Sequence, residues 1–145
     1  MKGVLQRVAR AEVSVAGERI ATIGPGLLVF VAIEPDDGEA EFRWIVDRVL
    51  ELRIFPDERL PMNLSVCDVD GEVLVVSQFT LAADTSRGRR PGFSKVAPPQ
   101  QARQGYERVL TLLRERWPKV AAGRFGADMQ VALVNDGPAT FILER

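Results

Sequence analysis

Four consecutive residues, Ser77-Gln78-Phe79-Thr80, bring two hydroxyls and a side-chain amide to the end of an apolar run, Glu72–Phe79. Such a run predicts a buried strand, and binding groups usually lie on the loops that follow buried strands. A serine or threonine attacks as a nucleophile only when a base activates it. The chain contains no histidine, which excludes Ser-His-Asp and Cys-His catalysis. The alternative interpretation is that both hydroxyls bond only to nearby backbone.

A second candidate is Gly137-Pro138, within Asn135-Asp136-Gly137-Pro138. A peptide bond before proline adopts the cis form at a cost of only about 0.5–1 kcal/mol. Because Gly137 has no side chain, a cis unit would present bare carbonyl groups to a ligand. Such a rigid surface can sense the handedness of a bound group. The alternative is an ordinary turn between two strands.

A third candidate is the basic segment Ser86–Lys95, which contains no acidic residue. Its four cations are Arg87, Arg89, Arg90 and Lys95. Phe93 adds one aromatic face, and glycines and a proline favour irregular structure. Guanidinium and ammonium groups in such a cluster are suited to phosphate. The alternative is a solvated surface loop.

Composition narrows the classes of protein. The 19 Lys and Arg nearly balance the 20 Asp and Glu among 145 residues, for a net charge of −1. This balance excludes a protein that binds nucleic acid through a surface that is basic throughout, so any nucleic acid must bind to a local basic patch. We expect no DNA partner. The single cysteine, Cys67, cannot form an internal disulfide and fits a reducing cytosol. We expect no metal site, no cofactor, no membrane partner and a cytoplasmic location.

The pattern of apolar residues predicts one domain over residues 1–145. The predicted strands are Lys2–Val15, Glu18–Ile23, Gly26–Ile33, Glu72–Phe79, Phe125–Val134 and Ala139–Leu143. The predicted helices are Glu39–Ile54 and Pro99–Trp117. This order indicates a mixed α+β or α/β fold, with two helices packed on a partly closed, mixed sheet of about six strands. The long loop between Ala82 and Pro99 is expected to be functional or mobile.

The motifs resemble those of bacterial-type D-aminoacyl-tRNA deacylases. Ser77-Gln78-Phe79-Thr80-Leu81 and Asn135-Asp136-Gly137-Pro138-Ala139-Thr140 carry most of the resemblance, and Gln6-Arg7-Val8 and Gly126-Ala127-Asp128-Met129 extend it along the chain. The resemblance implies an enzyme that hydrolyses the ester joining a D-amino acid to the 3′ end of tRNA. It also implies removal of glycine mischarged on alanine tRNA, and a homodimer with its active sites at the interface.

The resemblance further implies roles for individual residues. Gly137 and Pro138 would enter the partner's site as a chiral filter that rejects L-amino acids. Arg7 would brace the carbonyl groups of that element. The ester and terminal adenosine would be lined by Ser77, Gln78, Phe79 and Thr80. The pocket would be completed by Phe93 and Met129, and tRNA phosphates would meet Arg87, Arg89, Arg90 and Lys95.

Hydrolysis without a histidine is possible if the substrate supplies its own assisting group. The ribose hydroxyl beside the ester would act at high effective molarity, while backbone N–H groups around Ser77 to Thr80 stabilise the oxyanion. Two alternatives remain. A non-catalytic RNA-binding module would bind with a steep salt dependence and hydrolyse nothing. A small-molecule hydrolase using Thr80 or Ser77 would cleave simple aminoacyl esters that lack the ribose hydroxyl.

Overall fold

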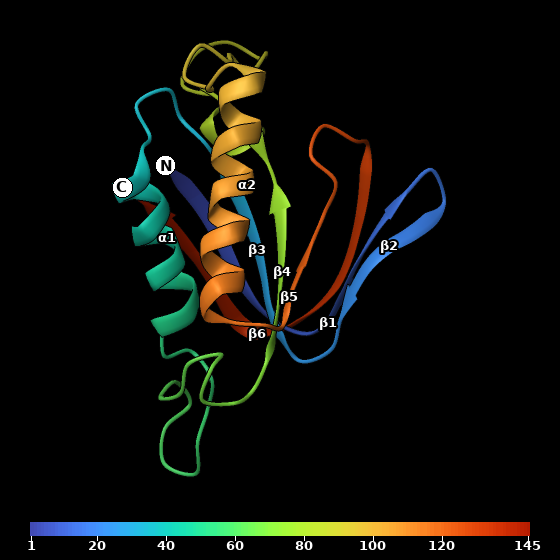
Figure 1. The fold of residues 1–145 in the computed structure, drawn as a ribbon, viewed down its shortest axis with the longest axis vertical. Helices are drawn as coiled ribbons and strands as arrows, with labels where there is room; N and C mark the ends of the chain where they lie inside the picture. The colour runs from blue at the N-terminus through green and yellow to red at the C-terminus, as the bar shows by residue number, and fades with distance from the viewer.

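A computed structural model of residues 1–145 shows two helices against one face of a six-stranded mixed sheet (Figure 1). The strands are β1 (Lys2–Val15), β2 (Glu18–Ile23), β3 (Gly26–Ala32), β4 (Glu72–Ser77), β5 (Val120–Ala122) and β6 (Met129–Glu144). The helices are α1 (Glu39–Glu51), the 3₁₀ helix η1 (Phe79–Ala82) and α2 (Pro99–Arg116). The predicted fold class is confirmed.

The sheet is nearly closed because β1 is shared among several partners. The strand order is β2-β1-β3-β4-β5, and β6 pairs with β1 off this path. The first half of β1 pairs with β3, its second half pairs with β2, and β6 runs antiparallel to almost its whole length. β3, β4 and β5 are parallel neighbours. In Figure 1 the β1–β2 hairpin and part of β6 turn away from β3 and β4, on the side opposite the helices.

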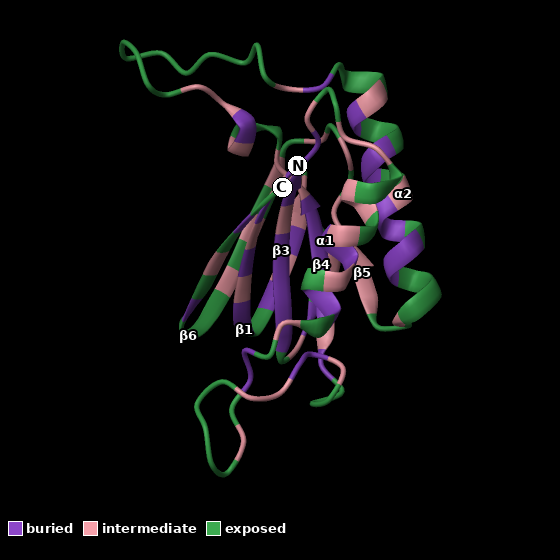
Figure 2. Cartoon of the chain, turned by 90° about the vertical axis from the view of Figure 1, so that its left-hand side faces the viewer, coloured by how far each residue is buried: buried purple, intermediate pink, exposed green.

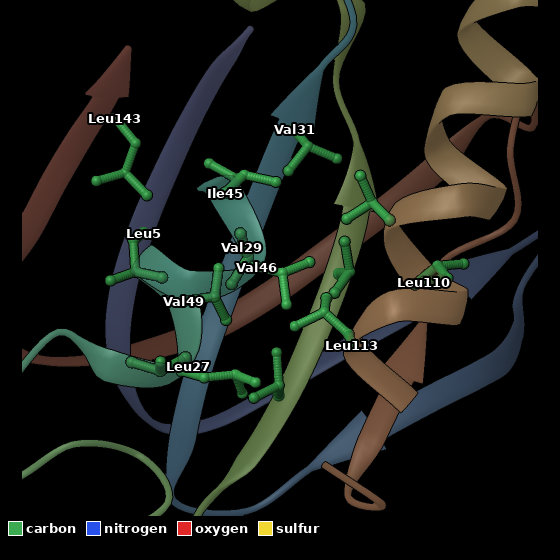
Figure 3. Packing of buried hydrophobic residues seen from close by; sticks show 14 of the residues in the cluster. Leu5, Leu27, Val29, Val31, Ile45, Val46, Val49, Leu110, Leu113 and Leu143 are labelled. Atoms are coloured by element: carbon green, nitrogen blue, oxygen red, sulfur yellow. The ribbon is translucent and has the colours of Figure 1, made fainter. Parts of the chain in front are cut away.

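Apolar side chains fill both faces of the sheet. The helical face packs against α1 and α2 through residues such as Leu5, Leu27 and Val29 (Figure 3). The opposite face forms a smaller cluster inside the curl, which includes Leu28 and Leu74. Since β3 is covered on both sides, an unbroken apolar run is the pattern its environment requires. No helix combines the length and apolar character needed to cross a membrane.

Two predicted boundaries are wrong. α1 ends at Glu51 rather than Ile54, because Leu52 adopts an extended backbone and Phe55 donates its N–H to the Leu64 carbonyl at 2.8 Å. β4 ends at Ser77 rather than at Phe79, where the short helix η1 begins. The long segment between η1 and α2 is largely exposed (Figure 2).

The two predicted closing strands are also wrong. One strand, β6, runs from Met129 to Glu144, straight through Asn135–Pro138. Two register shifts against β1 take up the irregularity that these residues introduce. The three-residue strand β5 (Val120–Ala122) was missed because it is too short to show a period.

Gly26 brings two backbones unusually close at the start of the parallel β3–β4 pair. It pairs with Glu72 on one side and with Val8 of β1 on the other. A Cβ atom added to Gly26 would lie 1.9 Å from the Glu72 carbonyl oxygen. No side chain fits there without moving a strand.

We therefore expect Gly26→Ala to destabilise the fold by more than about 3 kcal/mol, since the overlap falls on backbone that cannot rotate away. Urea unfolding of the purified variant measures the change. Gly38→Ala is the control, because its Cβ would lie 3.8 Å from the nearest atom and its cost should stay within about 1 kcal/mol. Equal free energies of unfolding for the two variants would contradict the conclusion that β3 and β4 lie too close at Gly26 for a side chain.

Candidate active site

A cleft of about 860 Å³ opens where β4 ends. One wall comes from the end of β4, η1 and the loop before α2, and another from the segment between β5 and β6 with the start of β6. Five residues predicted from the sequence line it: Ser77, Gln78, Phe79, Phe93 and Met129. The other lining residues are mostly apolar, among them Val96, Ala102, Phe125 and Val131. The cleft is therefore suited to a ligand with aromatic or apolar faces.

Two backbone N–H groups at the start of η1 are candidates for binding an oxyanion. The Gln78 N–H is already used, donating to the Val31 carbonyl at 2.7 Å. The first hydrogen bond of η1 runs from the Leu81 N–H to the Gln78 carbonyl at 3.1 Å. The N–H groups of Phe79 and Thr80 precede that bond, so the helix does not use them. Within the segment predicted to stabilise the oxyanion, Ser77 to Thr80, these two N–H groups therefore remain free to bind it.

The Thr80 hydroxyl is bonded to an amide, not to a base. Gln78 Nε2 donates to Thr80 Oγ1 at 2.6 Å, and an amide side chain accepts no proton from a hydroxyl at neutral pH. Thr80 is exposed and does not line the cleft. The arrangement orients the Thr80 oxygen without activating it.

The basic loop is attached to the cleft by an aromatic pair. The rings of Phe79 and Phe93 lie 5.4 Å apart, centroid to centroid, and both are about half exposed, at 52% and 46%. Asp84 and Gly92 exchange two backbone hydrogen bonds of 2.8 Å and close the loop. The Ser86 hydroxyl also bonds to Asp84 and lowers the pKa of that carboxyl. The loop carries four exposed cations, Arg87, Arg89, Arg90 and Lys95.

Apart from Met129, the opposite wall was missed by the sequence analysis. Phe125, predicted to begin a strand, instead lines the cleft and packs near the ring of Tyr106, with centroids 5.9 Å apart. Tyr106 donates its hydroxyl to the Val75 carbonyl at 2.9 Å, and burial raises the pKa of this phenol. The guanidinium carbon of Arg103 also lies over the Phe125 ring, 4.9 Å from its centroid. Residues on three separate elements meet here, and no local sequence pattern connects them.

The backbone on either side of Gly137-Pro138 is held by hydrogen bonds from two side chains, Arg7 and Asn135. The peptide bond between them is cis. Arg7, 8% exposed, donates from Nε to the Asp136 carbonyl at 2.9 Å and also bonds to the Ile54 carbonyl. Asn135, which the sequence analysis named in the motif without giving it a role, donates from Nδ2 to the carbonyls of Arg7 at 2.9 Å and Ala139 at 3.3 Å. Side chains thus fix the backbone on both sides of the dipeptide.

Gly137-Pro138 does not line the cleft of its own chain. Asn135 is level with Val8, Gly26 and Glu72, at the amino end of β4. Ser77 lies five residues further along that strand, a separation of roughly 17 Å at about 3.3 Å per residue. The structure therefore brings five predicted residues together at one end of the sheet and leaves the Gly-Pro element at the other.

The family model described as D-Tyr-tRNA(Tyr) deacylase matches residues 4–144. The chain is 55% identical over 144 residues to a D-aminoacyl-tRNA deacylase of Azotobacter vinelandii (strain DJ), with 99% of each chain covered. It is 52% identical over 144 residues to a protein of the same name from Thermotoga petrophila, with 99% of this chain and 97% of the relative covered.

Two solved structures are also similar. A structure described as the c-Myc DNA Unwinding Element Binding Protein has a TM-score of 0.94 and 42% identity, with 100% of this chain and 99% of that chain covered. A structure described as a probable eukaryotic D-amino acid tRNA deacylase has a TM-score of 0.84 at 18% identity, with 98% and 97% covered. The second likeness concerns the fold alone.

Proposed function

This chain belongs to the D-Tyr-tRNA(Tyr) deacylase family, and on that basis we propose that it hydrolyses the ester bond of D-aminoacyl-tRNA, releasing a free D-amino acid and tRNA. The cleft at the end of β4 is the observation that carries the proposal. Its volume of about 860 Å³ lies within the range of pockets that enclose a drug-sized ligand, which a terminal nucleoside and its ester resemble in size. Its apolar walls and aromatic rings suit a base, and free backbone donors suit an ester carbonyl.

In this mechanism the ester carbonyl points from the cleft toward the N–H groups of Phe79, which lines it, and of Thr80, the next residue along the chain. Water attacks the carbonyl carbon, and the carbonyl oxygen becomes an oxyanion that these fixed donors stabilise. The bond to the ribose oxygen then breaks, and that oxygen takes up a proton. Removal of one such donor typically slows acyl transfer by about 10²–10³, so backbone geometry at Phe79 is central to the rate.

In this proposal a group of the substrate, the ribose hydroxyl beside the ester, assists the proton transfer. The Thr80 hydroxyl accepts from Gln78 and has no base beside it, so Thr80 is not the nucleophile in this proposal. The ribose hydroxyl adjacent to the ester is already held next to the carbonyl, and such intramolecular groups act at effective molarities of up to about 10⁵–10⁸ M. The role of the protein is to orient the ester.

We further propose that Gly137-Pro138 of one copy enters the cleft of a second copy in a homodimer and rejects L-aminoacyl groups. The separation of this element from its own cleft supports a site shared between two chains. Its carbonyl groups would exclude a side chain on the L face. Since glycine has no side chain to exclude, glycine mischarged on alanine tRNA would also be cleaved.

The exposed cations Arg87, Arg89, Arg90 and Lys95 would bind tRNA phosphates. The Phe79–Phe93 contact supports this role, because it joins their loop directly to the cleft. Phe93 and Met129 would contact the terminal nucleoside. Since charged tRNA is the substrate, the proposal places the enzyme in the cytoplasm.

The central experiment measures deacylation of one tyrosine tRNA charged with D-tyrosine or with L-tyrosine, together with glycyl-tRNA. We expect rapid release from the D-form and the glycyl form, with the L-form near the uncatalysed rate. Equal release from the D- and L-forms would leave an esterase but remove the chiral filter. Binding of tRNA or duplex DNA with no release from any substrate would favour a nucleic-acid-binding module instead.

Thr80→Ala separates the two possible sources of chemistry. If the ribose hydroxyl assists, this variant should keep most of its kcat on D-tyrosyl-tRNA. Single-turnover rates provide the measurement. A loss beyond about a thousandfold, roughly 4 kcal/mol of barrier, with substrate binding unchanged, would establish Thr80 as the nucleophile.

Gly137→Ala tests the filter. A Cβ at Gly137 would lie 2.5 Å from Asn135 Oδ1, so the variant must displace Asn135 from its bonds to Arg7 and Ala139. We expect the ratio of D- to L-tyrosyl-tRNA cleavage to fall by at least about tenfold, about 1.4 kcal/mol of discrimination. Gly38→Ala, whose Cβ would make only an ordinary contact of 3.8 Å, should leave the ratio unchanged. An unaltered ratio in a folded Gly137→Ala protein would refute the assignment.

A further inference from the structure

Arg103 lies against two residues that line the cleft and has no carboxylate partner. It lies in the second turn of α2 and is exposed. Its guanidinium rests on the ring of Phe125, and Nη2 would lie 3.9 Å from a Cβ built on Gly126. Both Phe125 and Gly126 line the cleft. The positive charge is therefore directed at the wall opposite the basic loop.

Some arginines of the two helices have carboxylate partners, whereas Arg48, Arg103 and Arg114 have none. Arg108 forms two hydrogen bonds with Glu39 at 2.9 and 2.6 Å, and Arg116 pairs with Asp47 and Glu51. Arg103 has no such ion pair and donates no hydrogen bond within the chain. Stacking on Phe125 is its recorded interaction, a contact that typically contributes only about 0.5–1 kcal/mol at an exposed site. The contact holds the guanidinium over the ring while leaving its donors free.

We propose that Arg103, stacked on Phe125, binds a phosphate of the single-stranded 3′ end of the RNA, on the wall opposite Arg87, Arg89, Arg90 and Lys95. The inference rests on the proposed function, because the cleft must hold the terminal nucleoside for the preceding phosphate to reach Arg103. A guanidinium presents paired donors that match phosphate oxygens, and it can stack at the same time. Single-stranded nucleic acid is commonly held by this combination of aromatic ring and cation.

The neighbouring residues support a nucleic-acid ligand over a small acid. Arg124, directly before Phe125, is also exposed and without a carboxylate partner. With the basic loop, the two arginines place positive charge on both sides of the cleft. A free amino-acid ester offers no anion for either side, whereas a phosphodiester chain passing between them offers one to each.

The test compares two substrates that differ in their phosphates. One is D-tyrosyl-tRNA, and the other is 2′(3′)-O-D-tyrosyl-adenosine, which keeps the ester and nucleoside but has no phosphate. We expect Arg103→Ala to lower kcat/KM about tenfold on the tRNA and to leave the adenosine ester unchanged. Arg103→Lys should recover part of the loss. For binding of uncharged tRNA, the slope of log Kd against log salt should fall by about 0.7 in Arg103→Ala, the value of one single-strand phosphate contact.

Arg114→Ala is the matched control. Arg114 is an exposed arginine on the same helix, also without an ion pair, and it lies about 16 Å away along the axis, at 1.5 Å per residue. We expect it to behave as wild type on both substrates. An equal loss of kcat/KM in Arg114→Ala would mean that any positive charge on this helix has the same effect. That result would overturn the proposal.

Two further outcomes would also overturn it. Equal losses by Arg103→Ala on the two substrates would mean that Arg103 only shapes the cleft, and no change in rate or salt slope would mean that it does not touch the RNA. Thermal unfolding of each variant identifies any loss of fold. If the wild-type protein cleaves neither substrate, the proposed function fails, while the salt slope of tRNA binding still decides the role of Arg103.

Discussion

The hydrogen bonds that join β6, β1, β3 and β4 determine how far apart the end of β4 and the Gly137-Pro138 element lie. Because β1 is paired along both edges, the level of each residue in one strand is tied to a level in the others. Because β1 and β6 alternate more and less buried residues, a shift by one residue would turn their apolar side chains toward solvent, which holds this register. The consequence is spatial. Ser77 and Gly137 are fixed at opposite ends of the same sheet and cannot approach each other within one chain.

The candidate site relies mainly on backbone groups and apolar surface. In the proposed mechanism its geometry comes from N–H groups at the start of η1, from rings of three segments and, from a second copy, from carbonyl groups beside Pro138. None of these groups needs to exchange a proton. A chain without histidine can therefore support hydrolysis if its substrate brings the group that handles the proton. In the proposed chiral filter the stereochemical choice likewise depends on shape, and Arg7 and Asn135 both hold the backbone next to the dipeptide.

Local patterns in the sequence predicted the fold class and most elements, because alternating or unbroken apolar runs report directly on burial. The pattern failed at Asn135–Pro138, where turn-forming residues lie within β6. There the long pairing with β1 outweighs local preference. Five site residues were predicted because they belong to recognisable motifs or neighbour them. Phe125, Arg103 and Asn135 were not, since their roles arise from contacts between distant segments that leave no local signal.

The pair of rings from Phe79 and Phe93 has a thermodynamic consequence. In the free protein each ring is about half exposed, so water covers apolar surface at the mouth of the cleft. A nucleoside that covers both rings would release that water and lower the heat capacity of the complex relative to its parts. The enthalpy of association would thus become more favourable with rising temperature. In calorimetry, the change of binding enthalpy with temperature would report the burial of the two rings. The ionic contacts would instead appear in the salt dependence of the affinity.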